Sequence, residues 1–186
     1  MDYRSIIEKY YPEDDALRRL LLQHSRQVAD RCLVVCDSHP ELLLDRQFLE
    51  EAAMLHDIGI RWCHAPGIFC EGSEHYLRHG LIGGELLRRE GFPRHARVCE
   101  RHTGTGITVA PTSDDPVTLH LLPPDLVAAG FFVPETLEEQ LVCYADKFYS
   151  KSHPERVLTV SQAAQSLERF GHEGVEKFLT WAKMFE

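Results

Sequence analysis

The dipeptide His56-Asp57 constrains this chain more than any other feature of its sequence. His56 ends an apolar helical pattern and falls on the same helical face as three earlier residues, Leu49, Ala52 and Ala53. An imidazole next to a carboxylate at the core face of a helix is costly to bury unless both groups are satisfied. A metal ion satisfies both, so the dipeptide predicts a metal site to which other helices contribute ligands.

Apolar residues recur at helical spacing along nearly the whole chain, which predicts an all-α fold. Capping and breaking residues place the helices at about 15–38, 46–56, 73–90, 93–102, 134–148, 159–171 and 173–184. We expect a single domain over residues 1–186, with its core at about 17–151 and C-terminal helices at about 159–184.

The stretch 104–134 differs from the rest, because it holds five of the chain's ten prolines and the β-branched run Ile107-Thr108-Val109. A long irregular segment in a compact domain is usually functional or mobile. This segment could cover a site, and its Phe131-Phe132 could either stack a nucleotide base or anchor the segment in the core.

Four more polar residues lie on the core faces of predicted helices: His24, His79, His102 and Asp146. His24, for example, follows Leu20 by four residues and precedes Val28 by four. Burying these groups and the His-Asp pair singly would cost roughly 1–3 kcal/mol each, whereas one shared cation would offset them together. The set offers nitrogen and oxygen ligands without a thiolate. It therefore favours Fe or Mn, with Zn, Co and Mg as further candidates, over Ca.

The charge balance argues against one class of partner. The chain has 20 Lys and Arg against 29 Asp and Glu, a net charge of −9, whereas a general nucleic-acid binder shows a basic stripe or a high pI. A local cluster of Arg or Lys could still bind a small anion. The polar N-terminus resembles no secretory signal, and no apolar run reaches the roughly 18 residues of a membrane span. We therefore expect a cytoplasmic protein with no membrane and no stable nucleic-acid partner.

The other histidines and the cysteines have ordinary interpretations. Five histidines fall in loops or on polar faces and should be solvated: His39, His95, His120, His153 and His172. His64 and His75 flank the loop after the His-Asp pair and could face either a substrate or solvent. The six cysteines include no CxxC pair, so we expect buried free thiols, with a redox role left open for Cys63 and Cys70.

The order His24, His56-Asp57, Asp146 resembles the HD superfamily of metal-dependent phosphohydrolases. The string LHDIG at residues 55–59 is similar to that superfamily's HDIG variant. The resemblance covers about residues 17–151 and implies a single-domain HD-domain helical bundle.

The resemblance also implies two divalent ions for each chain, because His79 and His102 stand where binuclear members carry two extra histidines. The first ion would be held by His24, His56, Asp57 and Asp146. The second would be held by Asp57, His79 and His102, so that Asp57 bridges the two. The GYP signature is not present, and Thr103 follows His102. These features disfavour a cyclic dinucleotide phosphodiesterase and are closer to the branch that hydrolyses diadenosine polyphosphates.

Hydrolysis by a metal-activated water is the chemistry that the resemblance implies, with Asp57 and Lys147 as catalytic residues. Two ions would lower the pKa of a bridging water and stabilise the charge of a phosphoryl displacement. Cationic residues near the ligands could contact phosphate oxygens; they are Arg61, Arg78, Arg101, Lys147 and Lys151. For Lys147 the alternative is a surface salt bridge.

We therefore expect a phosphohydrolase or phosphodiesterase that cleaves a nucleotide, a dinucleotide or another small phosphate ester. The chain would work as a monomer or a homodimer. Two alternatives stay open. Some HD proteins with the same six ligands hold a mixed-valent di-iron pair and use O₂ to oxidise a C–H bond. Others could be catalytically silent modules that bind a nucleotide for regulation.

Overall fold

The computed structural model describes residues 1–105 and 132–186, and helices dominate both parts. The α-helices are α1 (Tyr3–Tyr10), α2 (Ala16–Ser38), α3 (Arg46–Leu55), α4 (His79–Arg89), α5 (Pro93–Arg101), α8 (Leu137–Asp146), α9 (Val160–Leu167) and α10 (His172–Phe185). Short 3-10 helices lie at η1 (Pro40–Leu42), η2 (Ile60–Trp62), η3 (Pro66–Ile68), η4 (Tyr76–Arg78) and η5 (Glu168–Phe170). No helix in these two parts is long and apolar enough to cross a bilayer.

Strand structure in the described residues is limited to one small hairpin and two isolated bridges. Strands β1 (His64–Ala65) and β2 (Cys70–Glu71) run antiparallel, with His64 opposite Glu71 and Ala65 opposite Cys70. The predicted single-domain all-α fold is therefore confirmed. The run at 107–109 and Phe131 lie outside the described residues, while Phe132 is buried.

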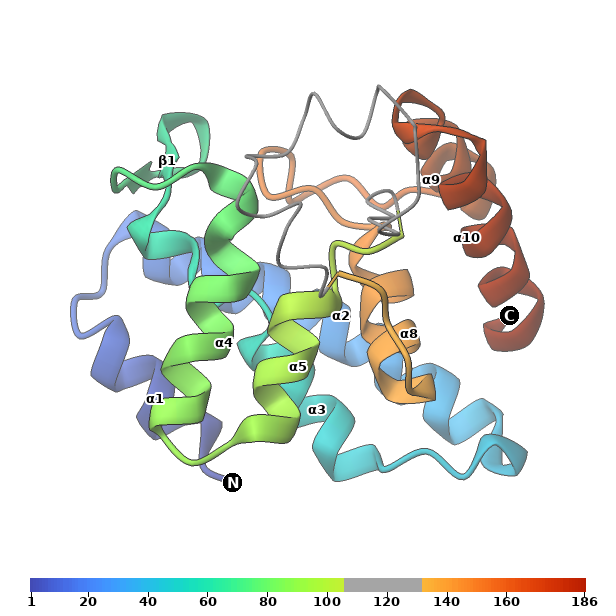
Figure 1. The fold of residues 1–186 in the computed structure, drawn as a ribbon, viewed down its shortest axis with the longest axis horizontal. Coiled ribbons are helices and arrows are strands. Elements are labelled where there is room, and N and C mark those ends of the chain that lie inside the picture. Colours follow the sequence, from blue (N-terminus) through green and yellow to red (C-terminus); the bar gives the residue numbers. More distant parts are fainter. Residues whose placement is uncertain (106–131) are drawn as a thin grey trace.

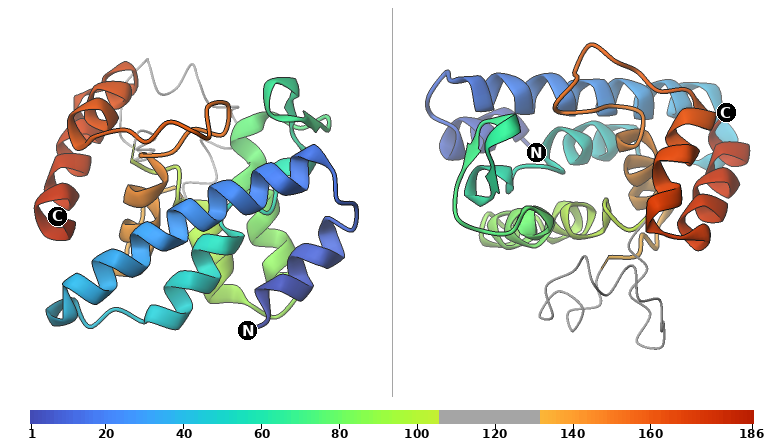
Figure 2. Two further views of the ribbon diagram at one scale, coloured as in Figure 1. Left: turned by 180° about the vertical axis from the view of Figure 1, so that it is seen from behind. Right: turned by 90° about the horizontal axis from the view of Figure 1, so that it is seen from above.

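The helices form layers around α3 and α8, as Figure 1 and Figure 2 show. Helix α2 packs against α3 and α8 on one face, and the α4–α5 pair lies on the opposite face. Helices α9 and α10 pack against each other at one side, where α10 contacts α8. One hydrophobic cluster joins all these α-helices, from Ile7 in α1 to Phe178 in α10.

Side-chain caps start several helices where the sequence predicts them. Asp15 and Asp45 each accept a hydrogen bond from the backbone N–H three residues later, at the starts of α2 and α3. Thr136 and Glu139 form a reciprocal capping box at the start of α8. These caps fix the register of the three helices that carry or adjoin His24, the His-Asp pair and Asp146.

The N-terminal half differs from the prediction in three places. Helix α1 has no counterpart in the predicted pattern, because only Ile6 and Ile7 of its eight residues are buried. The helix expected from residue 73 becomes α-helical only at His79, after a loop and η4. The β-hairpin before it carries no alternating pattern, because each strand has two residues.

The turn after the His-Asp pair is pressed against α4. A Cβ at Gly59 would lie 2.1 Å from the backbone oxygen of His79 and 2.6 Å from the backbone nitrogen of Gly83. The buried Tyr11 hydroxyl holds the same turn, because it donates to the Ile58 carbonyl at 2.8 Å and accepts from the Arg61 N–H at 3.1 Å. Glycine at position 59 therefore allows α4 to bring its first residue, His79, close to the His-Asp pair.

Replacing Gly59 by alanine should lower the free energy of unfolding by about 1–3 kcal/mol or more, because the added methyl group meets backbone atoms. Gly67→Ala is the matched control, since nothing lies within 4 Å of a Cβ at Gly67, and its effect should stay within about 0.5 kcal/mol. Urea unfolding followed by circular dichroism measures both. Equal stability of the two variants would contradict the close contact between the turn and α4.

Candidate functional site

The structure brings together the six residues predicted as metal ligands, and all of them are buried. They come from five helical segments: His24 from α2, His56 and Asp57 from the turn after α3, His79 from α4, His102 from the end of α5, and Asp146 from the end of α8. Among the described residues, two groups of three have their ligand atoms within 4.8 Å of one another. They are His24, His56 and Asp146, and His56, Asp57 and His102. We call the six residues the His–Asp cluster.

Asp57 occupies the centre of the His–Asp cluster. Its Oδ2 lies 3.3 Å from Nε2 of His24 and 3.3 Å from Nε2 of His56. Its Oδ1 lies 3.3 Å from Nε2 of His79 and 3.5 Å from Nε2 of His102. Each carboxylate oxygen therefore faces a separate pair of imidazoles, which is the arrangement that a bridging residue would have.

Backbone carbonyls orient three of the four imidazoles. Nδ1 of His56, His79 and His102 lies 2.6, 2.5 and 2.7 Å from the carbonyl oxygen of the residue three positions earlier. A carbonyl can only accept, so Nδ1 carries the proton and Nε2 is turned toward the cluster. In metal sites the same outer hydrogen bond fixes the tautomer and ring orientation of histidine ligands.

Two lysines balance the charge of the buried carboxylates. Lys151 Nζ lies 2.6 Å from Asp57 Oδ2 and 4.0 Å from Asp146 Oδ1. Lys147 Nζ lies 2.7 Å from Asp146 Oδ2 and donates to the His102 carbonyl at 3.3 Å. Burial alone would raise the pKa of Asp57, but the nearby Lys151 and His56 hold it well below its usual range. Lys147 thus forms a salt bridge, as the alternative to a phosphate contact supposes. The salt bridge lies within the cluster and not on the solvated surface.

The four imidazoles differ in their affinity for a proton. Burial, with the charge of Lys151 as a further cause, lowers the pKa of His24 to about 4. Burial also lowers the pKa of His79 to about 3, and it lowers that of His102, against the opposing effect of Asp57 in both cases. For His56, burial is outweighed by Asp57 and Asp146, which raise its pKa to about 9. Three of the four rings are therefore neutral near pH 7 and available as ligands.

A pocket of about 290 Å³ opens onto the His–Asp cluster. Its lining combines cluster residues with cationic and aromatic side chains, among them Lys147, Lys151, Arg169, Tyr76 and Phe170. A second cavity of about 350 Å³ shares Tyr76 and Lys151 with it. Cations next to aromatic rings suit a ligand that has both phosphate and a planar base. We call the 290 Å³ cavity the cluster pocket.

Only two of the five predicted phosphate-contacting residues line the cluster pocket, namely Lys147 and Lys151. Arg61 lies over the ring of Tyr11 at 5.6 Å. Arg78 pairs with a carboxylate one helical turn away at 3.0 Å. Arg101 is buried and pairs with Glu135 at 2.9 Å, so it ties α5 to the start of α8. The structure does not bring these three arginines to the pocket.

The pocket also contains residues that the sequence pattern does not indicate. Tyr76 comes from η4, and Arg169 and Phe170 come from η5, far along the chain from the ligands. Short 3-10 segments have no periodic pattern that would predict which side chains face a site. Only the packing of α9 and η5 near the cluster brings the last two residues there.

The remaining histidines and cysteines mostly agree with expectation. His95 is an exception, because it is buried and its Nε2 lies 3.1 Å from Glu51 Oε2. His64 and His75 are exposed, and His120 lies outside the described residues. All six cysteines are free thiols, and all but Cys36 are buried. Burial raises the pKa of Cys63 to about 12 and that of Cys70 to about 11, which disfavours a redox role.

Similarity searches connect the chain to proteins of archaea. It is 33% identical over 132 residues to an uncharacterized protein of Methanocaldococcus jannaschii, and the aligned region covers 66% of this chain and 66% of that protein. It is 28% identical over 170 residues to the tRNA (cytidine(56)-2'-O)-methyltransferase of Picrophilus torridus, covering 86% of this chain and 42% of that protein. The enzyme of the same name from Thermoplasma volcanium is 30% identical over 131 residues, covering 70% and 32%. The chain thus spans about two thirds or less of these relatives. No family model and no solved structure matches it.

These relatives contradict the predicted reaction. Two of them are named as tRNA methyltransferases, so hydrolysis of a phosphate ester, and with it the metal-dependent HD phosphohydrolase class and the di-iron oxygenase alternative, is wrong. The names of these relatives also contradict the expectation of two divalent ions as the reaction's cofactor. Because these relatives are named for their action on tRNA, they also contradict the expected small phosphate ester and the expected absence of a nucleic-acid partner. The error about nucleic acid came from the net charge, which does not describe local clusters of cations.

The pH dependence of stability should reveal the buried neutral imidazoles. The folded-state pKa values of His24 and His79 lie below the unfolded value of 6.5, so their stabilisation is complete above pH 6.5 and is lost as pH falls toward about 4 and 3. Between pH 6 and 5 each should lower the unfolding free energy by about 1 kcal/mol per pH unit. Urea titrations with EDTA measure this slope. The slope should decrease in His79→Gln and stay unchanged in His172→Gln, an exposed control; equal slopes in the two variants would contradict the assignment.

Proposed function

We propose that this chain acts in the methylation of tRNA, as a helical module that binds a nucleotide of the RNA at the cluster pocket. The observation that carries the proposal is the similarity to two tRNA (cytidine(56)-2'-O)-methyltransferases over 86% and 70% of this chain. Because the chain spans 42% and 32% of those enzymes, methyl transfer is a property of the whole relatives. We assign to this chain the recognition of RNA.

The lining of the cluster pocket supports a nucleotide as the ligand. Arg169 offers a phosphate an exposed guanidinium, and Tyr76 and Phe170 supply rings on which a base can stack. Lys147 and Lys151, which pair with Asp146 and Asp57, add positive charge to the same pocket. The described residues hold no parallel sheet, the element whose strand ends form nucleotide-cofactor sites in α/β folds. This favours RNA binding over donor binding for the chain. Work on tRNA also agrees with the cytoplasmic location, which we propose with it.

The binding of an unmodified tRNA transcript tests this proposal. Lys147→Gln and Arg169→Gln should each weaken binding by about fivefold to tenfold, because each removes one cation that faces phosphate. Lys183→Gln, which removes an exposed cation on α10 outside the pocket, should bind as the wild type does. Filter binding at two salt concentrations measures these affinities, and circular dichroism confirms that each variant is folded.

Two results would contradict the proposal. One is the absence of tRNA binding by the folded chain at low salt. The other is methyl transfer from S-adenosylmethionine to the transcript by this chain alone, which would assign the reaction itself, and not only recognition, to its residues.

We also propose, on the geometry alone, that the His–Asp cluster binds one divalent cation. The predicted ligand residues are part of this proposal. The specific observation is that imidazole and carboxylate atoms of the cluster face one another and that some of them have no hydrogen-bond partner. Nε2 of His56 and Oδ1 of Asp57 are buried without a hydrogen bond, although buried polar atoms normally have one. Both three-residue groups include His56, so they describe one location. The resemblance to the HD superfamily rests on the same residues and stays a proposal.

Metal analysis tests this second proposal. After equilibration with Mn²⁺ or Zn²⁺ and removal of excess ion, plasma mass spectrometry should find about one ion for each chain. His56→Gln should lose most of the ion, because it removes a ligand common to both groups. His172→Gln, exposed and distant in sequence, should keep it. A folded His56→Gln variant with the wild-type metal content would contradict the assignment.

A further inference from the structure

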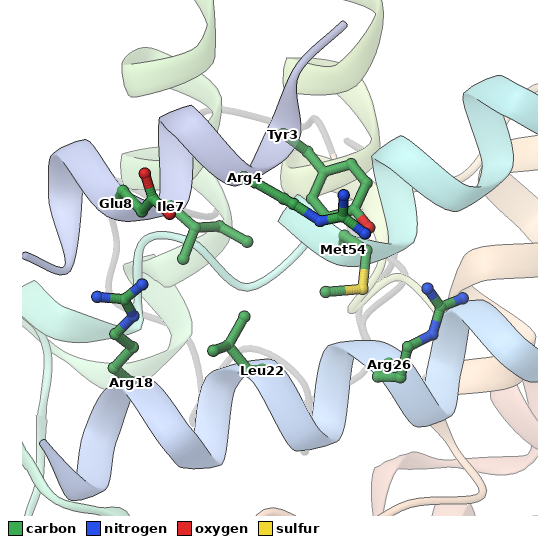
Figure 3. A pocket seen from close by; sticks show the side chains of 8 residues that line it. All are labelled: Tyr3, Arg4, Ile7, Glu8, Arg18, Leu22, Arg26 and Met54. Carbon is green, nitrogen blue, oxygen red and sulfur yellow. The ribbon is translucent and has the colours of Figure 1, made fainter. Parts of the chain in front are cut away.

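A separate groove lies between α1 and α2, and Figure 3 shows the side chains that line it. Side chains of α1 face those of α2 across the groove, and Met54 of α3 forms part of its floor. The cavity has a volume of about 380 Å³, within the range of small-molecule sites. It shares no lining residue with the cluster pocket, so it is a separate cavity.

The floor of the groove is apolar. Ile7 and Met54 are buried and Leu22 of α2 is half-buried. In Figure 3 Leu22 points from α2 toward Ile7 and Met54. The ring of Tyr3 stands at one end. Such a floor favours a flat or apolar group over a hydrated ion, because burying it removes apolar surface from water.

Two guanidinium groups at the ends of the groove form no ion pair within 4 Å among the described residues, although the charge of Asp2 acts on Arg4. Arg4 lies at the Tyr3 end and stacks over that ring at 5.5 Å. Arg18 lies at the other end and donates to the Pro12 carbonyl at 3.4 Å. The third arginine, Arg26, is already paired with two carboxylates at 2.8 Å. Cations therefore remain available at both ends of an apolar floor.

This arrangement is unusual in the surface of an acidic chain. The neighbouring Arg19 pairs with Asp14 at 3.1 Å, and most other described arginines also have an acidic partner within 4 Å. Glu8 of α1 also lines the groove, at the end where Arg18 lies. Guanidinium is suited to phosphate because its N–H groups match two phosphate oxygens.

We propose that this groove binds a nucleoside that carries a phosphate on each side, the chemistry of an internal nucleotide of RNA. One phosphate meets Arg4, the other meets Arg18, and the base or ribose lies on the floor formed by Ile7, Leu22 and Met54. The inference goes beyond the proposed function and does not depend on it, because it rests on different residues. A free nucleoside bisphosphate and a nucleotide within RNA share this chemistry.

Calorimetric titration with adenosine 3',5'-bisphosphate tests the proposal. The bisphosphate should bind about tenfold more tightly than adenosine 5'-monophosphate, and adenosine should show no measurable binding, because each phosphate adds one charged contact. Arg4→Gln and Arg18→Gln should each weaken binding of the bisphosphate by about tenfold. Arg19→Gln, one residue along α2 and outside the groove, is the matched control and should stay within about twofold.

A second variant tests the floor without changing charge. Leu22→Trp fills the groove from a half-buried position, so it should abolish bisphosphate binding while thermal unfolding shows a folded chain. Retained binding in this variant would overturn the assignment of the floor and with it the proposal.

The two pockets can be separated by their variants. Bisphosphate binding should survive Lys147→Gln, whereas loss in Lys147→Gln with retention in Arg18→Gln would place the ligand at the cluster pocket and overturn this inference alone. Absence of binding to the folded wild type at about 1 mM would also overturn it. If an RNA trinucleotide displaces the bisphosphate, the natural ligand of the groove is a nucleotide within RNA. If it does not, the ligand is a free nucleotide. Both results support binding of a nucleoside that carries two phosphates.

Discussion

The buried carboxylate of Asp57 is the group on which the arrangement of the helices depends. It has no exposed surface, and groups from α2, α4, α5 and the loop after α8 approach it within 4 Å. A buried charge that loses a partner destabilises a protein by about 3–5 kcal/mol. Any shift of one helix would therefore leave Asp57, Lys151 or an imidazole unpaired, so the same contacts that form the cluster also fix the helix positions.

Much of this centre could be predicted from sequence because helical geometry is local. The spacing of His24 from Leu20 and Val28 is enough to place it on the core face, and the same reasoning identifies the other cluster residues. Caps such as Asp15 and Asp45 are local as well. The pocket walls are different, because Tyr76, Arg169 and Phe170 belong to short 3-10 segments whose position depends on packing between distant parts of the chain.

The reaction could not be predicted in the same way. A set of ligands defines what an ion would touch, but many reactions and many binding modules can be built on one fold. The relatives named as tRNA methyltransferases show how far a resemblance based on a few residues can mislead about activity. Net charge misled as well: a chain with −9 overall still places Lys147, Lys151 and Arg169 around one pocket and Arg4 and Arg18 around another.

The hydrogen bonds from imidazole Nδ1 to backbone carbonyls have a consequence for whatever the cluster binds. His56, His79 and His102 each anchor to a carbonyl three residues earlier, so helix geometry and not the occupant sets the position of each ring. The conformational entropy of ordering these side chains is therefore lost during folding, before any ligand arrives. The cluster is therefore preorganised before a ligand binds. Its selectivity depends on how well a ligand fits the fixed ring positions, and not on movement of the side chains.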